Sequence, residues 1–217
     1  MPGCPVWSLR DLVAHVGKVQ RFWAVTVAAG PRDKPSTQEM AGDATPRGDL
    51  VAWSADSTAL LLTALRAAGP EQGCWAWWGA SEAPLTAGAV ARHQVREAAV
   101  HAYDAQQTVG LREPVPAAVA VDGVAEFLTV SYGTSGPWPH RPARVGWYAA
   151  EGSSWLLDLT PSGAVVGRDA EESPAAAVHG SAGDLLLALF GRIPLHRLRI
   201  EGSRALVEAL LAWPSLD

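Results

Sequence analysis

The chain has 217 residues, of which 48% are apolar, so it is long enough for one large domain or two small ones with a packed core. Its 17 basic and 22 acidic side chains give a net charge of -5, and no Lys/Arg-rich run provides the basic surface that nucleic-acid binding normally requires. No apolar run approaches the roughly 20 residues of a membrane-spanning helix, and the N-terminus lacks the pattern of a signal peptide. We therefore expect a cytoplasmic protein that contacts neither nucleic acid nor membrane.

The two cysteines, Cys4 and Cys74, are far apart, and neither belongs to a CxxC pair. This excludes a disulfide framework and a cysteine-rich zinc site. Any thiol chemistry must then come mainly from a molecule outside the chain. The ten tryptophans include three in the segment CWAWW at 74–78. We expect these tryptophans to fill a core; the alternative is that they line a substrate pocket.

The first half is predicted to be helical. Ser8, with Asp11 three residues later, can begin a helix whose apolar side chains recur at helical spacing to about residue 29. Two more segments combine a capping residue with helical periodicity, and a further segment can form a fourth helix. These segments are 50–68, 86–110 and, for the fourth helix, 117–132.

From about residue 143 short runs rich in Val, Trp, Tyr and Leu alternate with Gly, Ser and Pro turns, which is typical of hairpin strands. Two helices capped by Ser181 and Ser203 follow, each after a short strand-like stretch. The pattern predicts an α+β protein whose domain boundary falls in the Pro-containing stretch 111–118. We place a helical domain at 1–115 and a smaller α+β domain at 116–217.

Glu97 and His101 are the first candidates for chemistry. They are four residues apart on the third predicted helix, so they lie within about 40° of each other on one face and can reach one ion. A carboxylate and an imidazole suit zinc or nickel, and helical bundles commonly build metal sites from inward-facing side chains. Taken alone, the pair can equally be an ion pair at the surface.

His15 supplies a candidate for the third ligand, because it lies at the edge of the apolar face of the first helix; a partly buried, hydrogen-bonded histidine is the alternative. His93, four residues before Glu97, is a candidate for a fourth ligand or a supporting group. Asp104 is placed to accept the second N–H of a ligating imidazole at His101. Arg92 and Arg96 are interpreted as surface charges or anion contacts. The three predicted metal ligands are therefore His15, Glu97 and His101.

The segment PGCPVWSLRDLVAHVG, followed much later by REAAVHAYDAQ, resembles the mycothiol-dependent maleylpyruvate isomerase family of the DinB-like superfamily. In that family a Cys-Pro-x-Trp-Ser/Thr segment opens a helix that carries a histidine ligand, and a Glu-x-x-x-His followed by Asp supplies the rest of the site. LLLALFGRIP and RIEGSRALVEALLA are similar to the family's small C-terminal domain. The resemblance implies a DinB-like up-down helical bundle. Family members usually begin with another helix before the Cys-Pro segment, which here starts at residue 3. That helix is then either missing, supplied by 117–132, or lost through a late start codon.

The resemblance also implies a mechanism. A divalent metal, with zinc preferred and nickel as the alternative, would bind mycothiol and stabilise its thiolate, which can add to an activated double bond, allow rotation and be expelled. Addition without expulsion would make the protein an S-transferase. Arg192, in LFGRIP, is the matching candidate for binding an acidic small-molecule substrate; a surface arginine at a helix C-terminus is the alternative.

Two other functions stay open from the sequence. The same scaffold can serve as a metal-dependent hydrolase with water as nucleophile, or as a non-catalytic metal-binding or regulatory protein. The oligomeric state also stays open, as a monomer or a homodimer.

Overall fold

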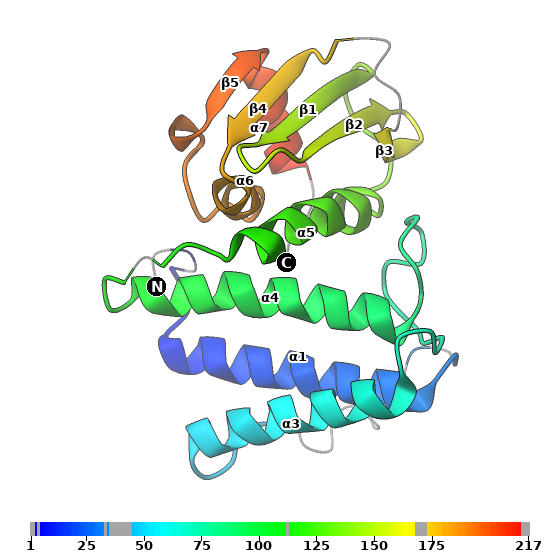
Figure 1. Cartoon of the computed structure of the whole chain (residues 1–217), viewed down its shortest axis with the longest axis vertical. Helices are drawn as coiled ribbons and strands as arrows, with labels where there is room; N and C mark the ends of the chain where they lie inside the picture. The colour runs from blue at the N-terminus through cyan, green and yellow to red at the C-terminus, as the bar shows by residue number, and fades with distance from the viewer. Residues whose placement is uncertain are drawn as a thin grey trace. The chain divides into compact units, whose positions relative to one another are not determined.

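A computed structural model shows the chain as two compact units (Figure 1). The residues that it describes are 3, 5–32, 34, 45–111, 113–167 and 173–213. The first unit contains the described residues up to Gly79 together with Pro84–Glu113, and the second contains Ala80–Ala83 and the described residues from Pro114 onward. The predicted α+β class is confirmed, because the N-terminal region is helical and a five-stranded sheet follows. Cys4 lies outside the described residues.

The described helices of the first unit begin at the predicted capping residues. They are α1 (Leu9–Ala29), α3 (Leu50–Ala68) and α4 (Ala87–Gln107). In each, a side-chain oxygen of the residue before the helix accepts a backbone hydrogen bond from the first turn, which satisfies one of the amides that a helix leaves without an internal partner. The capping residues are Ser8, Asp49 and Thr86.

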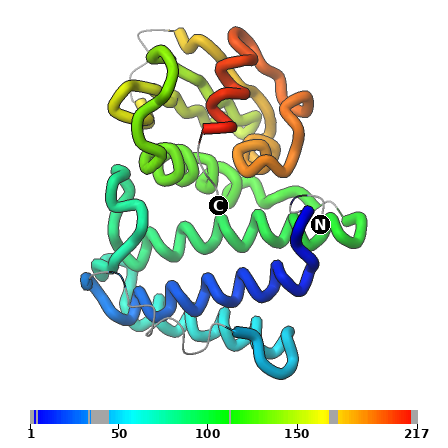
Figure 2. Tube along the Cα trace, turned by 180° about the vertical axis from the view of Figure 1, so that it is seen from behind, coloured from blue at the N-terminus to red at the C-terminus, as the bar shows by residue number. Residues whose placement is uncertain are grey.

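Helices α1 and α3 pack closely and run parallel. A Cβ on Gly17 would lie 2.2 Å from the Trp53 ring, so this glycine lets the two helices approach. One turn further along both helices, the buried Arg21 donates to the Ser57 hydroxyl at 2.7 Å. Because the contacts advance together along the two helices, α1 and α3 point in the same direction, side by side in Figures 1 and 2.

Helix α4 runs antiparallel to α1. The His15 ring, near the start of α1, lies 5.2 Å from the ring of His101, in the second half of α4. Further along α1, the Trp23 ring lies 5.9 Å from that of His93, nearer the start of α4. This antiparallel pairing brings the first helix of the chain against the Glu97–His101 stripe.

The second unit begins with helix α5 (Ala117–Phe127), which continues into a π-helical turn at Leu128–Tyr132, so the predicted segment 117–132 does form a helix. It packs on α6 within this unit. The sheet has the order β3-β2-β1-β4-β5, with β1 and β4 parallel and the other neighbours antiparallel. The remaining elements are β1 (Ala143–Ala149), β2 (Ser154–Thr160), β3 (Gly163–Gly167), β4 (Ala176–Gly180), α6 (Ala182–Leu189), a 3₁₀ turn (Leu195–Arg197), β5 (Arg199–Gly202) and α7 (Arg204–Ala212).

One face of the sheet forms the core of the second unit. Val145 and Trp147 of β1 are fully buried there beside Leu157 of β2 and Val178 of β4. Helix α7 lies behind the sheet in Figure 1 and in front of it in Figure 2, so it covers one face. The alternation of strand residues explains this arrangement, because every second side chain points to the helices. No helix among the described residues is long and apolar enough to cross a membrane.

Candidate metal centre

The start of α1 fixes the position of His15. The backbone N–H of Ser8 donates to the Asp11 carboxylate at 2.8 Å, and the backbone N–H of Asp11 donates to the Ser8 hydroxyl at 3.2 Å. This reciprocal capping box sets where the helix begins and therefore which residues face α4. His15 follows on the second turn, with its ring 4.8 Å from that of Trp7.

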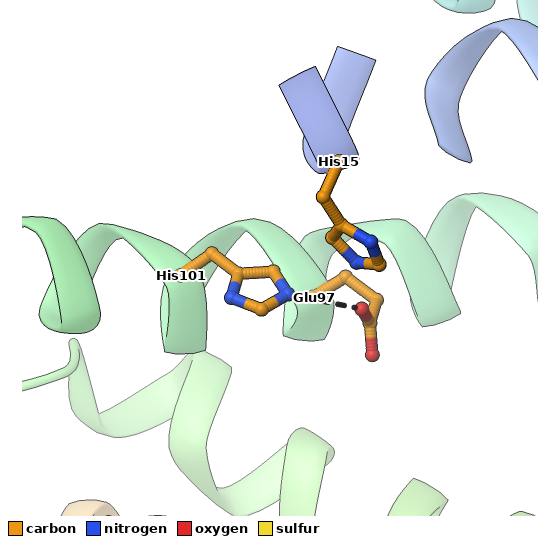
Figure 3. A group of neighbouring side chains, drawn as sticks. All are labelled: His15, Glu97 and His101. Atoms are coloured by element: carbon orange, nitrogen blue, oxygen red, sulfur yellow. Dashed lines mark ion pairs between the residues drawn. The ribbon is translucent and has the colours of Figure 1, made fainter. Parts of the chain in front are cut away.

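Three side chains from two helices converge, as Figure 3 shows. One ligand atom from each of His15, Glu97 and His101 can be chosen so that all three lie within 4.8 Å of one another. The Nε2 atom of His101 lies 3.6 Å from a carboxylate oxygen of Glu97. All three side chains are partly exposed, so the cluster is open to a small ligand from outside.

Asp104 supports His101 from the other side of the ring. Its carboxylate lies 3.1 Å from His101 Nδ1, and the Asp104 side chain is completely buried. A carboxylate in this position accepts the Nδ1–H, so that once the ring is neutral Nε2 is the nitrogen that can bind an ion. The structure thus gives Asp104 the contact predicted for it.

Arg96 is buried, so of the two interpretations given for it the surface charge was wrong and the contact with an anion is the one that the structure shows. The side chain is 4% exposed, and it donates to a Glu97 carboxylate oxygen at 3.1 Å while lying 3.2 Å from Nδ1 of His93. A guanidinium tolerates burial when a carboxylate neutralises it, and this pairing could not be read from the helix alone. Arg96 therefore holds the Glu97 carboxylate in place.

His93 belongs to an aromatic cluster. Its ring centroid lies 5.0 Å from that of Trp78, 5.8 Å from Trp77 and 5.9 Å from Trp23, and the side chain is buried. Within the described residues, the group that could hold a metal does not include it. Trp78 is buried, as expected for a core tryptophan, whereas Trp77 is 44% exposed.

The charges in the cluster depend on one another. Burial alone would raise the pKa of Glu97, but the hydrogen bond from His101 and the charge of Arg96 outweigh it and lower this pKa to about 2. Burial disfavours the imidazolium of His101, yet the carboxylates of Asp104 and Glu97 raise its pKa to about 9. Burial lowers the pKa of His15, and the neighbouring His101 lowers it further. Without an ion, the cluster thus pairs a charged His101 with an ionised Glu97 and favours a neutral His15.

A small recess between α1 and α4 contains the cluster. Its walls include the three converging side chains, two further amides and three apolar residues. The lining residues are His15, Val16, Val19, Gln20, Gln94, Glu97, Ala98 and His101. Gln94 and Gln20 are not among the residues predicted from the sequence, although Gln94 lies three positions before Glu97 on α4, a spacing that places it near the same face.

Comparison with known protein families covers both halves of the chain. The model of the mycothiol maleylpyruvate isomerase N-terminal domain matches residues 1–106, and that of the MDMPI C-terminal domain matches residues 118–209. The chain belongs to the mycothiol maleylpyruvate isomerase family. This confirms the resemblance inferred from the sequence motifs. A comparison with curated proteins gave no match.

The donor set of this family member fits a divalent ion of the zinc type. Two imidazoles and one carboxylate are ligands that zinc and nickel accept, and three protein ligands leave room for an exogenous one. Donors in a tetrahedral zinc site stand about 3.3 Å apart at metal–ligand distances of roughly 2.0–2.1 Å. The three candidate donors lie within 4.8 Å of one another, so they would have to move closer together to bind one ion.

Arg192, the substrate-binding candidate that the family motif suggests, belongs to the second unit. It follows α6, and its Nη1 donates to the backbone carbonyl of Phe190 at 2.8 Å. Its guanidinium carbon lies 6.0 Å from the centre of the Phe190 ring. Arg192 is partly exposed, and its contact with Phe190 is one that an arginine at a helix C-terminus makes.

Proposed function

We propose that this protein is a metal-dependent enzyme that uses mycothiol, activated by the metal, for isomerisation or S-transfer on a small electrophilic substrate, as in maleylpyruvate isomerisation. The observation that carries the proposal is the convergence of His15, Glu97 and His101 from two antiparallel helices at one accessible point. Membership of the mycothiol maleylpyruvate isomerase family supports the choice of thiol and of reaction class.

In this proposal, His15, Glu97 and His101 hold a divalent ion, with zinc preferred and nickel as the alternative. Such an ion, when bound, stabilises a thiolate and lowers the pKa of the thiol, so that a nucleophile exists near neutral pH. Asp104 keeps the His101 ring turned toward the site, and Arg96 orients the Glu97 carboxylate. These two supporting residues reduce the rearrangement that ligand binding requires.

The chain's own described cysteine is a poor nucleophile. Cys74 is 3% exposed, and burial raises the pKa of its thiol, so the reactive thiolate form is disfavoured. This supports a thiol supplied from outside. A cytoplasmic location, where low-molecular-weight thiols stay reduced, is consistent with that requirement.

Arg192 is proposed to bind a carboxylate of an acidic substrate such as maleylpyruvate. Its guanidinium can form paired hydrogen bonds with a carboxylate, which a lysine cannot reproduce. The contact with Phe190 uses Nη1 as a donor to a neutral carbonyl.

The first test is the metal content of the protein purified without chelators, measured by elemental analysis. About one zinc or nickel ion per chain is expected in the wild type, with loss in His15→Ala and in His101→Ala. His196→Ala is the matched control, because this exposed histidine lies outside the cluster and should leave metal content unchanged. A wild-type protein that binds no ion would contradict the proposal.

Turnover distinguishes the remaining alternatives. With metal bound, we expect cis–trans isomerisation of maleylpyruvate, or transfer of the thiol to it, only when mycothiol is added. Mycothiol should also raise the unfolding temperature of the metal-loaded protein and leave that of the metal-free protein unchanged. Hydrolysis without any thiol would favour the hydrolase, and bound metal without turnover would favour a non-catalytic role.

A further inference from the structure

Gln94 is a buried amide beside the candidate metal centre. The residue is 9% exposed, and its Nε2 is enclosed without a hydrogen-bond partner among the described residues. A buried donor without a partner is unfavourable, and such groups in native proteins are few and call for an explanation. Gln94 is one of the residues that line the recess with the three candidate ligands.

The position of Gln94 on α4 places it next to those ligands. It precedes Glu97 by three residues, or about 4.5 Å along the helix axis, and precedes His101 by seven residues, which brings it to within about 20° of the same face. The antiparallel α1 closes the opposite side of the recess with Val16 and Val19. Gln94 therefore lies about one turn before Glu97 along α4, in a recess with partly apolar walls.

Gln20, the second amide side chain of the recess, does have a hydrogen-bond partner. The Gln20 side chain accepts a hydrogen bond from the Thr58 hydroxyl at 3.0 Å, so α3 holds it in place. Arg96 and Asp104, the polar neighbours on α4, contact Glu97 and His101 respectively. Within the described part of the recess, the Gln94 nitrogen thus remains as an enclosed donor that no protein acceptor uses.

We propose that Gln94 donates a hydrogen bond to the anionic atom of a ligand that occupies the His15–Glu97–His101 centre, and so selects anionic ligands at that position. The inference rests on the proposed metal site. The shared chemistry is an anionic acceptor bound next to the ion, whether the sulfur of a thiolate or the oxygen of a carboxylate. Hydrogen bonds to charged acceptors are stronger than neutral ones, so the donor gains most when such a ligand arrives.

The test uses cobalt(II)-loaded protein, because cobalt(II) replaces zinc in such ligand sets and its visible spectrum reports exogenous ligands. Wild type, Gln94→Met and Gln94→Glu are titrated with N-acetylcysteine in one series and with acetate in another. Gln94→Met keeps the length of the side chain but removes the donor, and Gln94→Glu keeps its shape but replaces the donor with a negative charge. Gln107→Met, at the last turn of α4, is the matched control.

With cobalt content unchanged, both Gln94 variants should bind the anionic ligand about tenfold or more weakly than wild type, and Gln107→Met should not. Weakening confined to N-acetylcysteine would identify the thiolate as the acceptor, and weakening confined to acetate would identify the carboxylate. Unchanged affinities in both Gln94 variants would overturn this inference while leaving the metal site intact. If the wild-type protein binds neither cobalt nor zinc, both the proposed function and this inference are overturned.

Discussion

At the scale of single residues, His101 of the metal-free candidate site carries a proton that has to leave before an ion binds. His101 lies between the carboxylates of Glu97 and Asp104, which raise its pKa to about 9. An imidazole binds a metal only in its neutral form, so metal binding has to release this proton. The same carboxylate at Asp104 that orients the ring thus also makes the metal-free site sensitive to pH.

Metal affinity should therefore rise with pH. Between about pH 6.5, where unperturbed histidines lose their protons, and the His101 pKa of about 9, one proton is released per ion bound. The apparent Kd for zinc should then fall roughly tenfold per pH unit and level off above pH 9. The apparent Kd for zinc can be measured from pH 6.5 to 9.5 by competition with a chromophoric chelator.

The Asp104→Asn variant is the control for this pH dependence. It removes one of the two carboxylates that raise the pKa of His101, so the plateau of zinc affinity should begin at lower pH. A wild-type affinity that does not change over this range would rule out a charged His101 in the metal-free protein.

At the scale of elements, close packing of α1 on α3 holds His15 in position. Gly17 faces the Trp53 ring, and a Cβ there would come within 2.2 Å of a ring carbon. Glycine is an unfavourable residue inside a helix by about 1 kcal/mol relative to alanine, so its presence in α1 has a packing reason. His15 lies only two residues away and depends on this alignment.

Gly17→Ala should destabilise the protein despite alanine's better helix propensity. Overpacking against Trp53 is expected to lower the free energy of unfolding by about 1–3 kcal/mol, measured by urea denaturation. Gly183→Ala in α6 is the control, because a Cβ there meets atoms no closer than 3.7 Å and should be neutral or slightly stabilising. Equal stability of Gly17→Ala and wild type would mean that Trp53 moves aside without cost.

At the scale of the whole molecule, the candidate metal ligands belong to the first unit and Arg192 to the second. Each unit has its own core, with Trp23 and Val27 among the buried residues of one and Trp147 and Val178 among those of the other.

Arg192→Met should lower kcat/KM for maleylpyruvate by about 10–100-fold with metal content unchanged, because a charge-assisted contact to the substrate carboxylate contributes about 1.5–3 kcal/mol. Steady-state kinetics of the metal-loaded enzyme with saturating mycothiol measures the effect. Arg197→Met, which removes an exposed arginine of the neighbouring 3₁₀ turn, is the control. If Arg192→Met instead lowers the unfolding temperature and leaves the kinetics unchanged, Arg192 stabilises the end of α6 and does not bind the substrate.

The sequence by itself determined the helices, the strands and the pairing of Glu97 with His101, because capping, periodicity and spacing of four residues act within a few turns of one chain segment. His15 became the candidate third ligand from its place at the edge of the apolar face of the first helix, and the family motif matched it. Only the tertiary structure decided that His15 meets the other two, that Arg96 is buried against Glu97, and that Gln94 lines the recess. These outcomes depend on how α1 packs against α4, a contact between segments some 80 residues apart that no local pattern specifies.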